Sequence, residues 1–310
     1  MYAAFFVKPT VDSVGTERPA VEQRDLIYSV TMPADNEIWA VGNYGKVIIS
    51  QDEGATWDLQ SSGVSSHLQS MAAWSADRAV AVGNDLTVIY TSDGGKEWAK
   101  ASVVAPKNMA QNKLLRVRVA ADGQAVAVGE FGTIILSSDF GKNWHAVSAG
   151  GDTSWFDASI IDAQSFVIVG EVGHIKKTID GGATWADLPS ATESTLNSVF
   201  FRDPQHGMAA GTGGVVVYTS DSGETWTLLP KLTSQHIFDV MWDGTRWVLT
   251  GDKGLLLFGS PDATTWDDAT KLTDSSWHTQ AAFRNGVYAL AGRGGINIIK
   301  PDSDNKKNGN

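Results

Sequence analysis

The polar residues with the clearest capacity for chemistry recur at one position of a repeated strand pattern. Each stands two residues after an apolar residue, and the set is Ser29, Ser70, Arg116, Asp157, Ser198, Asp239 and Thr279. If the strands surround a channel, these side chains could form a binding ring, with the cation Arg116 one repeat before Asp157. Alternatively, the strands only need a polar side toward channel water, and Arg116 and Asp157 then form an ordinary ion pair.

Further candidates for partner binding lie in short turns and in one long loop. Glycine-flanked turns contribute Tyr44, Glu130, Phe131, Glu171 and Asp252. The segment Val103–Lys113 is about five residues longer than its counterparts and contributes Lys107, Met109 and Lys113. Long loops on a rigid scaffold often carry binding residues, although a neutral insertion explains the extra length equally well. The expected rim, mixed aromatic and charged, is completed by Arg116, Arg118, Asp157 and Asp239.

The sequence offers no pattern typical of a metal or cofactor site. There are no cysteines, and the six histidines show no short ligand spacing. A recurring turn contains one aspartate in each copy, which is too few carboxylates for a calcium cage. No phosphate-binding loop and no Ser-His-Asp arrangement can be placed. We therefore expect no cofactor, no metal and no catalytic residues.

Composition narrows the range of partners. The chain has 35 acidic and 24 basic residues, a net charge of −11, and no run of Lys or Arg longer than two. Nucleic acids and anionic membrane surfaces are therefore poor partners. No apolar run approaches the roughly 18–20 residues of a membrane span. The first residues are too short for a signal peptide, so the protein is either cytoplasmic or exported with that peptide absent; we expect export, and a monomer.

The element that must position these residues is a repeated turn of the form Ser/Thr-x-Asp-x-Gly-x-x-Trp. In such a turn the Asp can accept backbone N–H groups, the Gly can adopt positive φ, and the Trp can anchor the outgoing strand. The Asp and Trp pairs are Asp52 and Trp57, Asp93 and Trp98, Asp139 and Trp144, Asp180 and Trp185, and Asp221 and Trp226. A degenerate sixth copy contains Asp262 and Trp266.

A second glycine series gives the number of repeats. Gly42, Gly83, Gly129, Gly170, Gly211, Gly251 and Gly292 follow short apolar runs at intervals of 40 or 41 residues, apart from one interval of 46. Four short strands can be placed in most repeats, and no segment has a helical period. This arithmetic predicts an all-β, seven-bladed propeller with four-stranded antiparallel blades. The expected blades are residues 26–62, 67–103, 113–149, 155–190, 195–231, 236–271 and 277–300.

The last repeat supplies only three strands, and residues 1–25 precede the first blade. The apolar segment Ala3–Pro9 could form the missing outer strand, which would close the ring and protect a sheet edge. A disordered leader is the alternative. Residues 301–310 form a polar tail that we expect to be frayed.

The turns resemble the Asp-box repeat found in sialidases and in other propellers. The blade that begins Leu196-Asn-Ser-Val-Phe-Phe-Arg-Asp-Pro-Gln-His-Gly also resembles the blade pattern of the photosystem II stability/assembly factor family, as does Ile27-Tyr-Ser-Val with Trp39-Ala-Val-Gly42. The resemblance covers roughly residues 26–300 and implies a seven-bladed propeller that helps to assemble a membrane complex. In photosynthetic relatives it also implies an arginine-rich surface patch. Here only Arg116 and Arg118 lie close together, which puts the photosystem role in doubt.

The first alternative is a glycan-binding or glycan-cleaving propeller of the sialidase-like superfamily. Phe201-Arg-Asp-Pro204 resembles a sialidase motif, but it falls at a turn on the face away from the expected site and has Asp203 in place of an apolar residue. A glycosidase also needs two carboxylates about 5–10 Å apart, and Asp157 and Asp239 are the only inner-strand candidates. We therefore expect a non-catalytic scaffold that binds a protein of a membrane-associated complex or transporter at the channel mouth.

Overall fold

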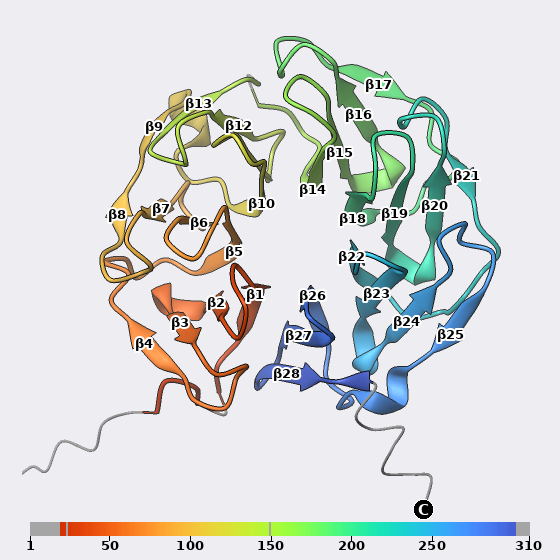
Figure 1. Ribbon diagram of the computed structural model, residues 1–310. Helices are drawn as coiled ribbons and strands as arrows, with labels where there is room; N and C mark the ends of the chain where they lie inside the picture. Colours follow the sequence, from red (N-terminus) through yellow and green to blue (C-terminus); the bar gives the residue numbers. More distant parts are fainter. Residues whose placement is uncertain (1–18, 23, 149, 302–310) are drawn as a thin grey trace, which may run out of the picture.

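The computed structural model describes residues 19–22, 24–148 and 150–301, which form seven β-sheets arranged as blades around a central channel (Figure 1). Each sheet is antiparallel in chain order from the channel outward, with one parallel strand added to blade three. The prediction of an all-β, seven-bladed propeller is confirmed. Most blades have four strands, as expected; the described part of blade seven has three, and the sheet of blade three has five.

The strand bounds show how regular the repeat is. Blade one contains β1 (Ile27–Thr31), β2 (Ile38–Gly42), β3 (Val47–Ser50) and β4 (Asp58–Gln60). Blade two contains β5 (Leu68–Ala73), β6 (Ala79–Gly83), β7 (Val88–Thr91) and β8 (Ala99–Lys100). Blade three contains β10 (Leu114–Val119), β11 (Ala125–Gly129), β12 (Ile134–Ser137) and β13 (Asn143–Ala146), with β9 (Ser102–Val104) at its outer edge. Blade four contains β14 (Trp155–Ile160), β15 (Phe166–Gly170), β16 (Ile175–Thr178) and β17 (Ala186–Leu188).

The remaining blades follow the same order. Blade five contains β18 (Leu196–Phe201), β19 (Gly207–Gly211), β20 (Val216–Thr219) and β21 (Thr227–Leu228). Blade six contains β22 (Ile237–Trp242), β23 (Trp247–Gly251), β24 (Leu256–Gly259) and β25 (Trp266–Asp268), and blade seven contains β26 (His278–Arg284), β27 (Val287–Gly292) and β28 (Gly295–Ile299). Short 3-10 helices are η1 (Asn43–Gly45), η2 (Lys107–Met109), η3 (Glu171–Gly173), η4 (Thr212–Gly214), η5 (Asp252–Gly254) and η6 (Thr270–Leu272).

The core lies between neighbouring blades. The second strand of each blade is an apolar run without alternation because both of its faces are covered; all five residues of β2, for example, are buried. Trp39 and Val41 of blade one form one apolar cluster with Leu68 and Ile89 of blade two. Burying one such side chain contributes roughly 1.5–3 kcal/mol. Each blade therefore depends on both neighbours for its stability.

The Asp-box turns join the third and fourth strands and lie on the face opposite the Gly-x-x-Gly turns. In blade five, the Thr219 hydroxyl and the Thr225 N–H each donate to Asp221 Oδ1, at 2.8 and 2.9 Å. The Trp226 indole N–H donates to the Gly223 carbonyl at 3.0 Å. The degenerate sixth turn keeps this last contact, because Trp266 donates to the carbonyl of Ala263 at 3.1 Å. These hydrogen bonds fasten the blade edges.

Blade seven packs directly against blade one, as Figure 1 shows at the junction of the red and blue ends of the chain. Ile27 and Ile38 share an apolar cluster with Ala289 and Ala291, and Ala20 and Val21 pack against it. Within the described residues, β28 is the outermost strand of blade seven. The expected fourth strand, Ala3–Pro9, lies outside the described residues, so this closure stays a prediction.

We expect deletion of Ala3–Pro9 to lower the urea midpoint of unfolding, because β28 would lose the strand that covers its open edge. The midpoint should fall by several tenths of 1 M urea or more, as measured by tryptophan fluorescence. Deletion of residues 304–310 is the matched control and should leave the midpoint unchanged. Equal midpoints for both deletions would contradict closure by this segment.

Blade seven also begins its innermost strand differently. In each blade one residue of this strand pairs with the glycine that ends the second strand, and in blade seven this is His278, paired with Gly292. The sequence pattern, with an apolar residue two positions before Thr279, predicts Trp277 in this role. His278 is 1% exposed, and neither ring nitrogen has a hydrogen-bond partner among the described residues. Burial lowers the pKa of His278 below its ordinary value of 6.5, although Asp274, at 3.4 Å from Nε2, opposes this.

Lowering the pH from about 7.5 to about 5 should destabilise the protein. The His278 pKa is lower in the folded state, so the unfolded chain binds the proton more readily, and stability falls as the pH drops below 6.5. His278→Leu should reduce this pH dependence, because it removes the titrating imidazole. The variant should still fold, because most other blades have an aliphatic residue at this position. Urea midpoints at several pH values test this, and parallel pH profiles for the two proteins would be inconsistent with it.

Candidate functional site

Every innermost strand contains a β-bulge at the same place, and these bulges shape the channel mouth. The pairing register shifts between Ile27 and Ser29, and the other six blades show the same shift. The bulged residues are Tyr28, Gln69, Leu115, Phe156, Asn197, Phe238 and Thr279, and together with Arg116 they line one cavity of about 190 Å³. We call this the mouth cavity. In blade seven the bulge places Gln280, and not Thr279, at the position that follows the bulge.

The polar residues after the bulge point toward the next blade and do not face channel water. The Met71 N–H donates to Ser29 Oγ at 2.8 Å, and the Val240 N–H donates to Ser198 Oγ at 3.1 Å. The same contact joins Val117 to Ser70, Val199 to Asp157 and Ala281 to Asp239. The side chains are buried because they connect blades through backbone hydrogen bonds. These members therefore connect blades and do not form a ring that faces the channel, whereas the Arg116–Asp157 ion pair of the second interpretation is present, at 3.6 Å.

Blades three and seven do not make this contact. Gln280 Oε1 has no hydrogen-bond partner among the described residues, and Arg116 has no acceptor to offer the next blade. The Ala158 N–H, which occupies the matching place in blade four, donates instead to Asp157 Oδ1 at 2.8 Å. Arg116 reaches two carboxylates, with Nε 3.6 Å from Asp157 and Nη2 3.3 Å from Asp239. Arg118 adds a bidentate pair to Asp157, at 3.0 and 2.6 Å. We call these four residues the channel cluster.

The channel cluster has two cations and two carboxylates, and its carboxylates are inaccessible. The side chains of Asp157 and Asp239 are 0% and 2% exposed. Burial works to raise the pKa of Asp157, but Arg118 and Arg116 outweigh it and hold that pKa below its ordinary value. For Asp239, burial prevails over both arginines and raises the pKa. The expectation that Asp157 and Asp239 contact a partner is wrong, and neither can reach a substrate as a general acid or base.

The long loop has a structural role that its sequence did not reveal. Its first residues form β9, which pairs in parallel with β13, so Val103 belongs to a fifth strand of blade three. Met109 is completely buried, and the expectation that it contacts a partner is wrong. Lys107 is exposed, and Lys113 pairs with Glu130 at 3.0 Å. The extra residues therefore extend a blade and fill a gap.

The acidic residues of the Gly-x-x-Gly turns hold the inner strands. A Glu130 carboxylate oxygen accepts the Lys113 N–H at 3.3 Å, and a Glu171 oxygen accepts the Ser154 N–H at 3.0 Å. Asp252 accepts the N–H of Lys253 at 2.9 Å. In blade one Asn43 takes the same position and accepts the Leu26 N–H at 3.3 Å. These polar side chains are committed to the fold and offer little to a partner.

The next turn position carries bulky apolar residues on the same face as the mouth cavity. Tyr44, Phe131 and Val172 are 75%, 57% and 61% exposed. Each has positive φ, at 55°, 53° and 53°. The same position carries the exposed charged residues Asp85 and Lys253 in blades two and six, at 56° and 53°, and Gly213 and Gly294 in blades five and seven. We call these three residues the apolar rim. Val172 was not among the residues predicted from sequence, although its place inside a Gly-x-x-Gly turn was a usable signal.

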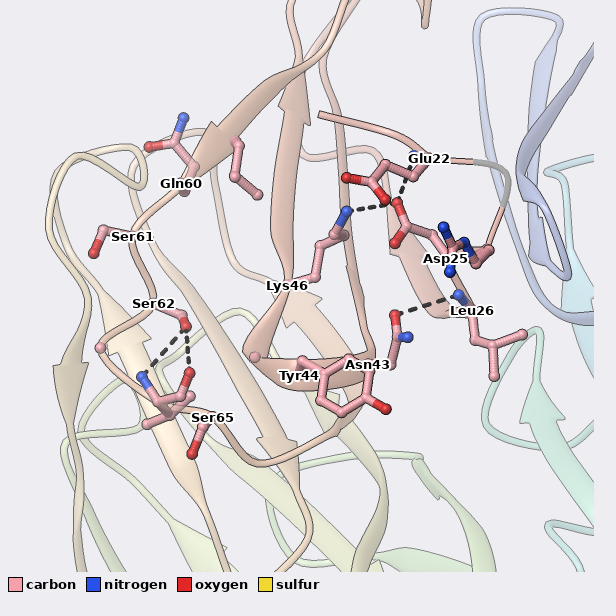
Figure 2. Close-up of a pocket in the computed structure, with 15 residues that line it drawn as sticks. Glu22, Asp25, Leu26, Asn43, Tyr44, Lys46, Gln60, Ser61, Ser62 and Ser65 are labelled. Atoms are coloured by element: carbon pink, nitrogen blue, oxygen red, sulfur yellow. Dashed lines mark hydrogen bonds and ion pairs between the residues drawn. The ribbon is translucent and has the colours of Figure 1, made fainter. Parts of the chain in front are cut away.

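Tyr44 also borders a large open groove of about 1330 Å³ above blade one (Figure 2). The groove lies between the segment before β1 and the loop after β4, and it is lined mainly by polar side chains such as Gln60, Ser61 and Ser65. Lys46 pairs with Asp25 at 2.5 Å along one wall. On its other side, the Tyr44 ring lies 4.9 Å from the ring of His67, which is 6.4 Å from the ring of Tyr28. An aromatic path therefore connects the rim to the mouth cavity.

No group of three or more His, Asp or Glu side chains that could hold a metal ion occurs in the described part of the chain. The same residues include no helix long and apolar enough to cross a membrane. Arg202, which belongs to the motif that resembles sialidases, pairs with its neighbour Asp203 and also donates to the Pro261 carbonyl. Three arginines converging on one open site are not present among the described residues.

The fold and the site thus define an Asp-box propeller with a plugged channel and an apolar rim. A family model described as photosynthesis system II assembly factor YCF48 matches residues 57–188 and 139–298, which together span most of the chain. The chain belongs to this family, as the blade pattern predicted. A comparison with curated proteins finds no match.

Solved propellers are similar in fold at low sequence identity. A structure described as YCF48 bound to D1 peptide has a TM-score of 0.73 and 19% identity, covering 90% of this chain and 92% of its own. YCF48 from Cyanidioschyzon merolae has a TM-score of 0.72 and 17% identity, covering 90% and 96%. The WD40 propeller domain of Doa1 also has a TM-score of 0.72, at 14% identity, and the match covers 90% of this chain and 94% of that domain's chain. Structural likeness at this level establishes the fold alone.

Removing one inter-blade contact should weaken the ring. In Ser198→Ala, the buried Val240 N–H loses its acceptor, and Asp157 and Asp239 lose the hydrogen bonds of the Ser198 hydroxyl; we expect a loss of about 1–3 kcal/mol in the free energy of unfolding. The matched control is Ser61→Ala, an exposed serine without a hydrogen bond to any described residue. Urea unfolding measures both, and an equal midpoint for the two variants would refute a stabilising role for this contact.

Proposed function

We propose that this protein is a non-catalytic assembly factor that binds a segment of a membrane-complex protein on the face that carries the apolar rim. The proposal rests on the chain's family and on a similar propeller that is described as bound to a peptide. It also rests on the site, where exposed aromatic and aliphatic side chains lie on the same face as the mouth cavity, and the carboxylates of the channel cluster are buried.

The observation that carries the proposal is the conformation of the apolar rim. A side chain other than glycine in the left-handed region costs roughly 1–2 kcal/mol per residue, and a β-branched residue such as Val172 is especially unfavourable there. Glycine fits the same turn without strain in blade five. Tyr44 and Phe131 also expose large apolar surfaces, which adds a solvation cost. Strain combined with exposure is typical of binding positions, because the partner's surface offsets both costs.

The surrounding charges favour binding by shape and apolar contact. Glu130, the residue before Phe131, forms an ion pair with Lys113. Glu171, the residue before Val172, accepts a hydrogen bond from the Ser154 N–H. A partner segment therefore meets little unpaired charge beside Phe131 and Val172, whereas Asp85 and Lys253 are exposed at the same turn position in blades two and six. Exposed aromatic residues are the usual anchors of such interfaces.

A second candidate is glycan binding, and the groove beside Tyr44 favours it. Hydroxyl and amide groups of Gln60, Ser61 and Ser65 line this groove next to an exposed aromatic ring (Figure 2). Sugars are recognised by this combination of hydrogen-bonding groups and an apolar face. Specific hits on a glycan array, without a protein partner from native membranes, would favour this second candidate.

Tyr44→Gly and Phe131→Gly should separate binding from stability. Each change relieves a strained turn, so the urea midpoint should stay equal or rise, while capture of a stoichiometric partner from solubilised native membranes should fall at least tenfold. The partner is identified by mass spectrometry and tested again as a purified protein.

The matched control is Ile179→Ser, which removes an apolar residue with 71% exposure from an Asp-box turn on the opposite face. This variant should capture the partner normally. Loss of capture in the control, or normal capture by both glycine variants, would rule out the rim as the binding surface.

A further inference from the structure

The mouth cavity is a second feature of this face, distinct from the apolar rim. Its wall has one bulged residue from each of the seven blades, and three of these, Tyr28, Phe156 and Phe238, are aromatic. All seven bulged residues are partly exposed, so a ligand can reach them. Its volume of about 190 Å³ is below the roughly 300–1,000 Å³ typical of small-molecule sites. The cavity is therefore of a size for one side chain.

The channel cluster closes the cavity from below. Arg116 lines the cavity and connects blade three to Asp239 of blade six, at 3.3 Å. Arg118 Nη2 lies 2.6 Å from Asp157 Oδ2 within the same cluster. Neither of these two residues lines the cavity. An extended chain cannot thread through the channel at this point. A ligand can only insert a side chain end-on from the mouth.

The charges of the cavity exclude both kinds of ion. Arg116 is the only charged lining residue, so a cation, which three aromatic rings could otherwise attract, would meet a positive charge. Arg116 could attract an anion, but its guanidinium already lies 3.6 and 3.3 Å from the buried carboxylates of Asp157 and Asp239, although its Nε has no hydrogen-bond partner among the described residues. Moving a further carboxylate into this site costs desolvation without a free partner.

The polar groups of the wall are also occupied. The Gln69 side-chain N–H donates to Asn84 Oδ1 at 2.9 Å, and the Asn197 side-chain N–H donates to the Ile237 carbonyl at 2.8 Å. The Thr279 hydroxyl donates to the Tyr28 carbonyl at 2.9 Å. These three donors are thus directed at the protein, whereas Arg116 Nε has no hydrogen-bond partner among the described residues. The three aromatic rings and Leu115 leave a largely apolar surface for the ligand.

We propose that the mouth cavity binds a single uncharged apolar side chain, aromatic or long aliphatic, and that in the proposed function this is the anchor of the partner segment. The remainder of that segment runs over Tyr28, His67 and Tyr44 toward the rim, because these rings form a continuous aromatic path. This part of the inference rests on the proposed function. The chemistry of the cavity does not depend on it.

Three probes of similar shape test the chemistry of the cavity: 2-phenylacetamide, phenylacetate and phenethylammonium. They are titrated into the full chain, and binding is followed by NMR through the amide signals of Tyr28, Phe156 and Phe238. The neutral amide should bind at least tenfold more tightly than either ion. Equal or tighter binding of an ion, or no shift with any probe, overturns the proposal.

Two variants test the role of the anchor. Leu115→Trp should fill the cavity, and Phe238→Ala should remove part of its wall, so each should weaken binding of 2-phenylacetamide at least fivefold. Each should also weaken partner capture at least fivefold. Ile179→Ser, on the opposite face, should change neither measurement. Circular dichroism and the urea midpoint show that each variant is folded, and Phe238→Ala serves alone if Leu115→Trp does not fold.

The outcomes separate this inference from the proposed function. If cavity variants capture the partner normally while Tyr44→Gly does not, the partner binds the rim, and the anchor is refuted. If wild-type protein captures no partner but binds 2-phenylacetamide in the cavity, the proposed function fails, and the assigned chemistry of the cavity stands.

Discussion

The ring depends on one repeated contact, a side chain after a β-bulge that accepts a backbone N–H from the innermost strand of the next blade. Ser29, Ser70, Asp157, Ser198 and Asp239 all make it. The bulge is what makes the contact possible, because it turns the polar residue sideways into the blade interface. The same bulge turns the extra residue into the channel mouth. One local irregularity therefore builds both the scaffold and its candidate site.

The channel cluster follows from the break in this series at blade three; in blade seven, Gln280 Oε1 also has no hydrogen-bond partner among the described residues. Arg116 cannot accept a hydrogen bond, so Asp157 satisfies the backbone of its own strand and also holds Val199 of blade five. A buried arginine then requires carboxylates, and Asp239 and Asp157 supply them. Buried ion pairs of this kind add little net stability, but breaking one leaves an unpaired charge that is expensive. The cluster plugs the channel and confines any ligand to the mouth.

The two faces of the molecule differ in a way that suits an assembly factor. The Asp-box face is fastened by local hydrogen bonds, and its carboxylates are held in turns; hydrogen bonds from Thr184 lower the pKa of Asp180 to about 2. The opposite face has strained turns with Tyr44, Phe131 and Val172 around an apolar cavity. On a chain with a net charge of −11, the apolar rim stands out as the place for specific contact.

The sequence by itself determined the fold, because the glycine spacing and the Asp-box turns are local signals that repeat with the blade. It also placed Tyr44 and Phe131 at exposed turns. Tertiary structure alone decided where Asp157 and Asp239 point, since a β-bulge breaks the alternation that assigns residues to strand faces. It also decided the burial of Met109. Burial in this fold depends on neighbouring blades that lie about 40 residues away in the sequence. For the same reason His278 takes the place expected for Trp277. The polar ring read from the sequence is a set of blade contacts, and the residues beside it form the mouth.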